Sequence, residues 1–154
     1  MIVATAMLLA AATPEVAFNP VEFFRGRSHG DGNLKVIFQR SKAIAVDSLG
    51  RDEKDGSLLL EQVIREPGKP ARTRFWRLRE TAPGRFDGTL TDAAGPVRVD
   101  VTGHKVRIRY QGKDHLDFEQ WLAPAGPGRV TNSMRVRRFG FTVARFEEVI
   151  RKLD

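Results

Sequence analysis

Apolar and polar residues alternate along much of the chain, most clearly in the stretch PVRVDVTGHKVRIRY, residues 96–110. Successive side chains of a strand point to opposite faces of its sheet, so this pattern makes one face apolar and the other rich in arginine. The Gly103-His104 pair between the two halves is typical of a turn. We therefore predict a β-hairpin with two faces. Its inward residues are Val97, Val99, Val101, Val106, Ile108 and Tyr110, and its outward ones include Arg98, Arg107 and Arg109.

Similar short runs recur at intervals of about 8–12 residues. They cover residues 34–40, 42–50, 57–65, 72–80, 85–92, 115–122 and 129–140. The segments between them, such as RDEKDG, EPGKPA and APAGPG, combine glycine, proline and aspartate as turns do. Nine or ten short strands joined by hairpins predict an all-β fold, either an antiparallel barrel or a sandwich.

The C-terminal segment FTVARFEEVIRKLD fits a different period. Apolar residues are spaced as on one face of a helix, and Glu147–Arg151 and Glu148–Lys152 are favourable i,i+4 pairs. Periodicity alone therefore predicts a helix here.

The N-terminus begins with MIVATAMLLAAA, an apolar run too short to span a bilayer. It has the length of the hydrophobic region of a signal peptide, and Ala10–Ala12 resemble a small-residue cleavage site. A first buried strand or helix is the alternative, since no Lys or Arg precedes Arg25. We expect residues 1–19 to be a signal peptide and leader, residues 20–154 to form a single barrel domain, and the protein to be periplasmic or secreted.

Composition narrows the chemistry of this 154-residue chain. The sequence contains no cysteine, which excludes disulfides, thiolate nucleophiles and Cys-ligated metals. The net charge of +7 favours an anionic partner, such as phosphate, lipid headgroups or acidic polysaccharide. A solvated cationic surface that only confers solubility is the alternative.

The stretch FFRGRSHGDG, residues 23–32, raises three interpretations. It lacks the Gly-Lys-Ser/Thr of a phosphate-binding loop, and a strand rather than a helix follows it. His29 and Asp31 would share a face of a strand, so they could act as a base and its orienting carboxylate. We favour a structural role, in which the preceding NPVEFF forms a short turn closing the barrel and Gly26, Gly30 and Gly32 let the first strand coil.

Two further patterns have weaker functional interpretations. In RTRFWRLR, arginines flank Phe75 and Trp76, as in some single-strand nucleic-acid binders, but they fall on both faces and match no RNA-binding signature. The three histidines lack partners at metal-ligand spacing. We expect no nucleic-acid partner, no metal site and no cofactor.

Several motifs together resemble a known family. FFRG, GDG, GTLTDAAGP, EQWL, TNSM and RRFGFTVA are similar to the landmarks of an uncharacterised bacterial envelope family, a domain of unknown function of the DUF3833 type, over residues 20–152. This resemblance implies a lipocalin- or calycin-like antiparallel β-barrel and makes residues 141–152 a final strand, which we adopt over the helix. It implies no catalytic residue. The chain lacks a lipobox cysteine, and Glu119-Gln120-Trp121 stands where the family typically has paired acids before the tryptophan.

The leading hypothesis is a non-enzymatic envelope barrel that binds a lipophilic or anionic amphipathic molecule, with peripheral membrane contact as a further candidate interaction. The candidate ligand-binding residues are Arg74, Trp76, Asp92, Glu119, Trp121 and Asn132. One alternative is a hydrolase or isomerase with a polar site inside the barrel, using His29, Asp92, Glu119 or Asn132. A basic structural or surface-association protein is the other.

Overall fold

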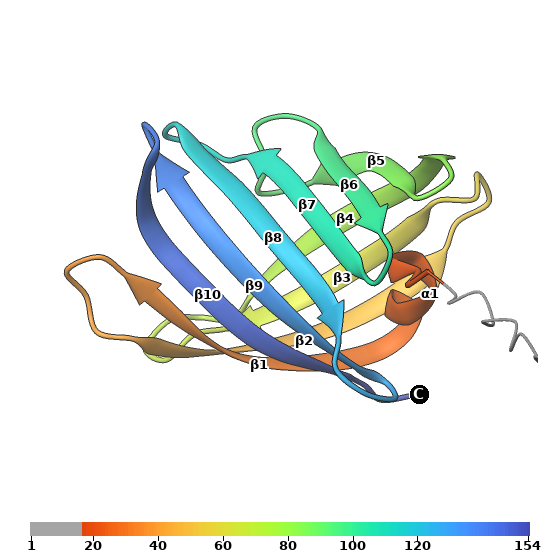
Figure 1. The fold of residues 1–154 in the computed structure, drawn as a ribbon. Coiled ribbons are helices and arrows are strands. Elements are labelled where there is room, and N and C mark those ends of the chain that lie inside the picture. Colours follow the sequence, from red (N-terminus) through yellow and green to blue (C-terminus); the bar gives the residue numbers. More distant parts are fainter. Residues whose placement is uncertain (1–16) are drawn as a thin grey trace, which may run out of the picture.

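The computed structural model describes residues 17–154, so the predicted signal peptide over residues 1–12 lies outside the described residues. Ten antiparallel strands follow one another and close into a barrel (Figure 1). Each strand pairs with its neighbours in sequence, and the first pairs with the last. The strands are β1 (Gly26–Val36), β2 (Lys42–Asp52), β3 (Leu58–Arg65), β4 (Arg72–Ala82), β5 (Arg85–Leu90), β6 (Val97–Thr102), β7 (Lys105–Gln111), β8 (Leu116–Pro124), β9 (Arg129–Arg138) and β10 (Phe141–Lys152).

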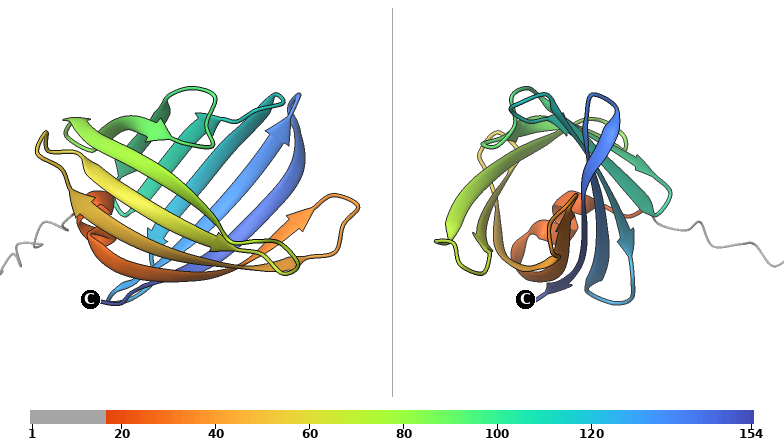
Figure 2. Two further views of the ribbon diagram at one scale, coloured as in Figure 1. Left: turned by 180° about the vertical axis from the view of Figure 1, so that it is seen from behind. Right: turned by 90° about the vertical axis from the view of Figure 1, so that its left-hand side faces the viewer.

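The two ends of the barrel differ because one carries a helix. The helix α1 (Pro20–Phe24) starts at Asn19, whose side chain accepts hydrogen bonds from the backbone N–H groups of Val21 and Glu22. Phe24 is buried in the barrel core, so α1 closes the end where the C-terminus also lies (Figures 1 and 2). The NPVEFF segment therefore closes the barrel as predicted, as a helix rather than a simple turn. The turns β1–β2, β3–β4, β5–β6, β7–β8 and β9–β10 all lie at the opposite, open end.

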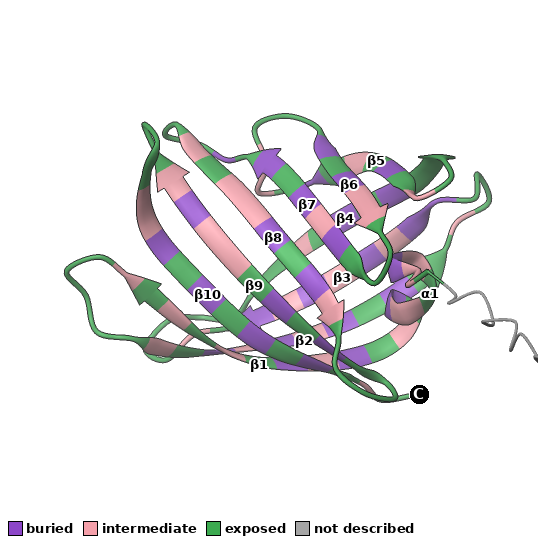
Figure 3. Cartoon of the chain, in the orientation of Figure 1, coloured by how far each residue is buried: buried purple, intermediate pink, exposed green. Residues whose placement is uncertain are grey.

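The hairpin predicted over residues 97–110 is confirmed. Val99 pairs with Ile108 and Val101 with Val106, which places the apolar side chains inside the barrel. Arg98 and Arg109 pair across the strands on the outer face. Buried and exposed residues alternate along the strands in the same way around the barrel (Figure 3).

The first strand differs from the prediction in its bounds. It begins at Gly26 and ends at Val36, whereas residues 37–40 of the predicted run form a turn. The glycine-rich stretch is therefore the strand itself. Gly30 and Gly32 face inward, and a Cβ on either would overlap a side chain of β10, Glu148 or Phe146 respectively. These glycines leave room for the large side chains of the neighbouring strand.

Residues 141–152 form a strand, as the family resemblance implied, and the helical interpretation is wrong. Every second residue from position 144 to position 150 is buried. Three of these residues are apolar, and the fourth is Glu148. Glu147 points outward and accepts a hydrogen bond from the Ser133 hydroxyl at 2.6 Å. An inward-facing glutamate masks the strand period, which explains why the segment resembles an amphipathic helix.

The two faces of β6 provide a direct test of the inward and outward assignment. Val99→Asp should lower the free energy of unfolding by roughly 3 kcal/mol or more, because an unpaired carboxylate would be buried. Arg98→Asp, one residue away on the outer face, should change it by about 0.5 kcal/mol or less. Urea unfolding of both variants measures this. Equal effects would show that the faces are assigned incorrectly.

Candidate functional site

The barrel interior contains a cavity of about 450 Å³ that reaches the rim at the open end. Its wall is mainly apolar and comes from strands on all sides of the barrel. The apolar lining residues include Leu34, Ile44, Val46, Ile64, Phe118, Met134, Val136 and Phe146. Charged residues lie at the rim, where Arg72 donates to Asp92 at 2.7 Å and Lys42 donates to Glu66 at 3.0 Å. The arrangement is an apolar pouch with a charged edge.

A layer of polar side chains forms the floor of this cavity. The layer includes Arg74, Gln120 and Asn132. These residues line the cavity on one side of the layer and a smaller space of about 50 Å³ on the other side. The layer separates the cavity from the apolar cluster around Phe24 and Leu58 at the closed end. Further buried polar residues among those described include Ser28, Ser48, Gln62, Tyr110 and Glu148.

Arg74 is the cation of this floor. Its Nε donates to Gln62 Oε1 at 2.8 Å, and its guanidinium lies 5.3 Å from the centre of the Trp76 ring. Gln62 Oε1 also accepts from Trp76 Nε1 at 2.7 Å, and Gln62 Nε2 donates to Ser48. These contacts hold the guanidinium in one orientation.

Arg74 feels the carboxylates of Asp92 and Glu148, but only Asp92 lies within ion-pair distance of it. Its Nη1 lies 3.7 Å from Asp92, a carboxylate that Arg72 already holds more closely. Within residues 17–154, neither Nη nitrogen has a hydrogen-bond acceptor. Burial lowers the pKa of Arg74, although an arginine stays protonated in proteins. The floor thus presents a fixed, desolvated cation with free donor capacity to the cavity.

Glu148 lies in the same layer. It accepts a hydrogen bond from Asn132 Nδ2 at 3.0 Å and packs against Gly30. Burial raises the pKa of Glu148, whereas the bond from Asn132 and the charge of Arg74 oppose that rise. Two buried oxygens nearby, Asn132 Oδ1 and Ser28 Oγ, have no hydrogen-bond partner in the described part of the chain. Hydrogen-bonding capacity therefore remains in this layer.

The structure divides the six residues predicted to bind a ligand. Arg74, Asn132 and Asp92 line the cavity, and Trp76 lies under its floor against Arg74. Glu119 and Trp121 instead lie on the outer face of β8. The sequence interpretation placed Tyr110 inside the barrel as part of the hairpin's apolar face, and it missed Gln62, Gln120 and Glu148. A detectable signal existed, because each of these polar residues interrupts an inward-facing apolar series, as in Leu58, Leu60, Gln62, Ile64.

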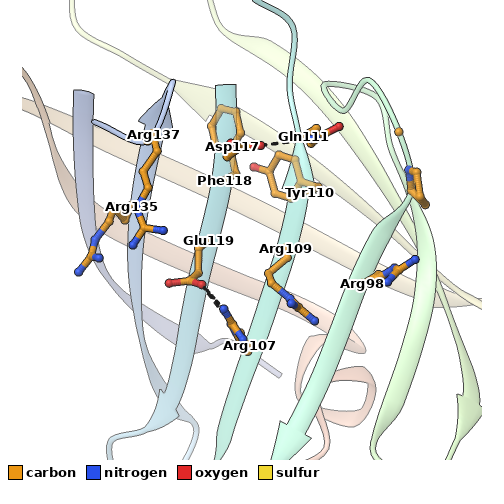
Figure 4. A pocket seen from close by; sticks show the side chains of 13 residues that line it. Arg98, Arg107, Arg109, Tyr110, Gln111, Asp117, Phe118, Glu119, Arg135 and Arg137 are labelled. Carbon is orange, nitrogen blue, oxygen red and sulfur yellow. Dashed lines mark hydrogen bonds and ion pairs between the residues drawn. The ribbon is translucent and has the colours of Figure 1, made fainter. Parts of the chain in front are cut away.

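Glu119 belongs to a shallow groove of about 600 Å³ on the outer face of β6–β9 (Figure 4). Arg107 donates to Glu119 at 2.6 and 3.1 Å and lies 5.4 Å from the Trp121 ring centre. The bond from Arg107 lowers the pKa of Glu119. Arg109 pairs with Asp100 at 3.0 Å. The groove is also lined by three further arginines, Arg98, Arg135 and Arg137.

The four residues considered for catalysis do not converge. His29 lies on the outer face of β1, where its ring contacts Asp47 at 2.6 Å and Asp31 at 3.1 Å. The hydrogen bond to Asp47 is the main reason that its pKa is raised. Asp92 lies at the rim, Asn132 on the floor and Glu119 on the outer wall.

Among residues 17–154, no three His, Asp or Glu side chains gather as a metal site requires. No helix in this range has the length and apolar character needed to cross a bilayer.

Comparison with known proteins identifies a family and a fold. The model of DUF3833, a protein of unknown function, matches residues 4–152. No curated protein matches the chain. The S-type phycobiliprotein lyase CPES from Guillardia theta has a similar structure, with a TM-score of 0.66 and 7% sequence identity over 87% of this chain and 91% of the lyase. A protein of unknown function of the DUF3598 family from Nostoc punctiforme has a TM-score of 0.63 and 10% identity, over 95% of this chain and 54% of that protein. At these identities the likeness is one of fold, and the predicted lipocalin-like antiparallel barrel is confirmed.

Glu148 gives the interior a defined pH dependence. An exposed glutamate titrates near 4.5, and burial raises the pKa in the folded state. The folded protein therefore binds this proton more tightly than the unfolded chain. The resulting stabilisation is complete below about pH 4.5 and is lost as the pH rises through the folded-state pKa.

Glu148→Gln keeps an acceptor for Asn132 Nδ2 but cannot ionise. We expect the variant to be more stable than the wild type near neutral pH. This difference in stability should shrink as the pH falls toward the pKa of Glu148 in the unfolded chain. Urea unfolding at a series of pH values measures this. Glu147→Gln, on the outer face, is the matched control and should show no gain in stability near neutral pH. If the stability of Glu148→Gln varied with pH in parallel with that of the wild type, the raised pKa of Glu148 would be wrong.

Proposed function

The chain belongs to DUF3833, a family of proteins of unknown function, and we propose that its barrel binds an amphipathic molecule with an acidic group. The observation that carries this proposal is Arg74, a fixed guanidinium in the floor of an apolar cavity. A carboxylate or phosphate could accept from both Nη nitrogens at once, as such groups do in bidentate pairs with arginine.

Cavity size and lining support the same molecule. A volume of about 450 Å³ lies in the range of small-molecule sites, which are typically apolar with a few fixed polar groups. The apolar wall, which includes Leu34 and Phe146, suits the hydrocarbon or ring system of such a molecule. The floor suits the acidic group of the same molecule. The acidic group would thus sit deep in the barrel, with the apolar part extending toward the rim.

The similar barrel of the phycobiliprotein lyase supports the proposal at the level of architecture alone. Its ligands are not transferred to this chain, because the two sequences share 7% identity. We propose binding without turnover, since the four candidate catalytic residues lie on the outer wall, the rim and the floor rather than together.

Arg74→Gln tests the role of the floor. It should weaken binding of dodecanoic acid by about tenfold or more, because a charge-assisted hydrogen bond contributes roughly 1.5–3 kcal/mol. Binding of dodecanol, which lacks the charge, should change little. Isothermal titration calorimetry with both compounds measures the difference.

Arg77→Gln is the control on the same strand, since Arg77 faces outward and pairs with Glu53. It should leave the affinity for both compounds unchanged. The proposal fails if the wild type binds neither compound, or if Arg74→Gln weakens the acid and the alcohol equally.

We also propose that the protein is periplasmic or secreted, on the basis of the apolar segment over residues 1–12. Mature protein from the native host should then begin near Thr13, which intact-mass spectrometry would detect. Protein that retains Met1 in a soluble cytoplasmic fraction would contradict this location.

A further inference from the structure

Exposed phenylalanines lie on two turns at the open end of the barrel. Phe38 in the β1–β2 turn is fully exposed, and Phe139 in the β9–β10 turn is 70% exposed. Their neighbours Ile37 and Phe141 are also exposed. Both turns belong to the rim of the cavity end, away from α1 (Figure 2). Exposed apolar side chains therefore occupy the tips of two separate turns at the same end of the barrel.

Both phenylalanines adopt a backbone conformation that does not favour them. Phe38 has φ 61° and Phe139 has φ 49°, in the left-handed region that bulky residues rarely occupy. Phe141 pairs with Arg138, so Phe139 and Gly140 form a two-residue loop with positive φ at both positions. Asparagine followed by glycine is preferred in such a loop. An aromatic residue in place of asparagine therefore points to a role other than folding.

Cationic residues lie next to both tips in the sequence, and the Phe139 ring also lies 5.2 Å from the His115 ring. Lys35 and Arg40 flank the β1–β2 turn, and Arg138 lies 5.7 Å from the ring centre of Phe139. The groove on the outer face of β6–β9 extends to Gly140 in the β9–β10 turn. Its residues Arg135 and Arg137 therefore continue the positive charge from this turn along the outer wall (Figure 4). The open end thus combines protruding aromatic rings with positive charge.

We propose that the open end of the barrel docks on the surface of an anionic phospholipid bilayer. Phe38 and Phe139 insert at the level of the headgroups, where aromatic residues are favoured, and the arginines contact lipid phosphates. This orientation places the mouth of the cavity against the bilayer. The docking surface goes beyond the proposed ligand binding and does not depend on it.

A bilayer explains these features better than two other partners. A soluble polyanion would use the arginines but would leave the phenylalanines exposed. A second copy of the chain would need a continuous complementary patch of about 1,000 Å² in total, whereas the rings lie on separate narrow turns. A soft surface that accepts separate protrusions fits both turns at once.

The test uses the full chain with phosphatidylcholine vesicles, either pure or with a third of phosphatidylglycerol. We expect sedimentation with the anionic vesicles only. Raising the salt from about 0.1 M to about 1 M should weaken the binding, because it shortens the Debye length from about 10 Å to about 3 Å. Absence of binding to the anionic vesicles would overturn the proposal.

The double variant Phe38→Asn/Phe139→Asn removes the rings while suiting the turn conformation. It should melt at the same or a higher temperature and lose at least about tenfold in vesicle affinity, since burying a phenylalanine is strongly favourable. Leu153→Asn, an exposed apolar residue at the closed end, is the control and should bind as the wild type does. Unchanged vesicle binding by the double variant would contradict the proposal.

A tryptophan at the tip reports its position directly. Adding anionic vesicles should shift the tryptophan emission of Phe38→Trp to shorter wavelength by more than it shifts the emission of the wild type. The emission of Leu153→Trp should shift no more than that of the wild type. If the double variant instead abolishes a concentration-dependent dimer in size-exclusion chromatography and no vesicle binding occurs, the tips contact a second copy and the proposal is wrong. Dodecanoic acid binding by the double variant should match the wild type, so failure of docking and failure of ligand binding are distinguishable.

Discussion

Pairing of β1 with β10 is the interaction on which the rest of the structure depends. It joins the ends of the strand order, so the sheet has no exposed edge and encloses an interior. The pairing brings large inward side chains of β10 against β1, and they fit because β1 has glycine at positions 30 and 32. Closure therefore requires small residues on one strand and places Glu148 inside the barrel. The interior polar layer and the cavity above it follow from this arrangement.

Enclosure also sets the electrostatics of the interior. A charged group removed from water is costly unless other groups replace its hydration. Gln62 and Trp76 contact the Arg74 guanidinium, and Asn132 binds the Glu148 carboxylate. The compensation is incomplete, since the Arg74 Nη nitrogens lack acceptors within residues 17–154 and Asn132 Oδ1 is unpartnered there. An incompletely satisfied polar layer at the base of an apolar cavity is the basis for our proposal of ligand binding, because apolar residues would pack there at lower cost.

Sequence patterns predicted most of the wall and part of the floor. Alternation located the hairpin over residues 97–110 with its register, because an apolar inner face and a charged outer face repeat every second residue. It failed at Glu148, where a buried acid within β10 suggested a helix, and the family resemblance supplied the strand. Arg74 and Asn132 were identified, but Glu119 and Trp121 lie on the outer face, as their position between inward-facing Phe118, Gln120 and Leu122 dictates. The stagger of the strands around the barrel decides which polar residues from distant strands meet at one level. Local sequence does not encode this stagger.

The two ends of the barrel contrast in how their residues serve stability. At the closed end, α1 is capped by Asn19 and buries Phe24 in the core, so sequence preference and packing agree. At the open end, Phe38 and Phe139 are exposed in a conformation that disfavours them, so preference and structure conflict. Such conflicts are expected where a site is maintained by function rather than by folding. The cavity reaches the rim at this same end, which places the conflict beside the entrance that any molecule bound at Arg74 must pass.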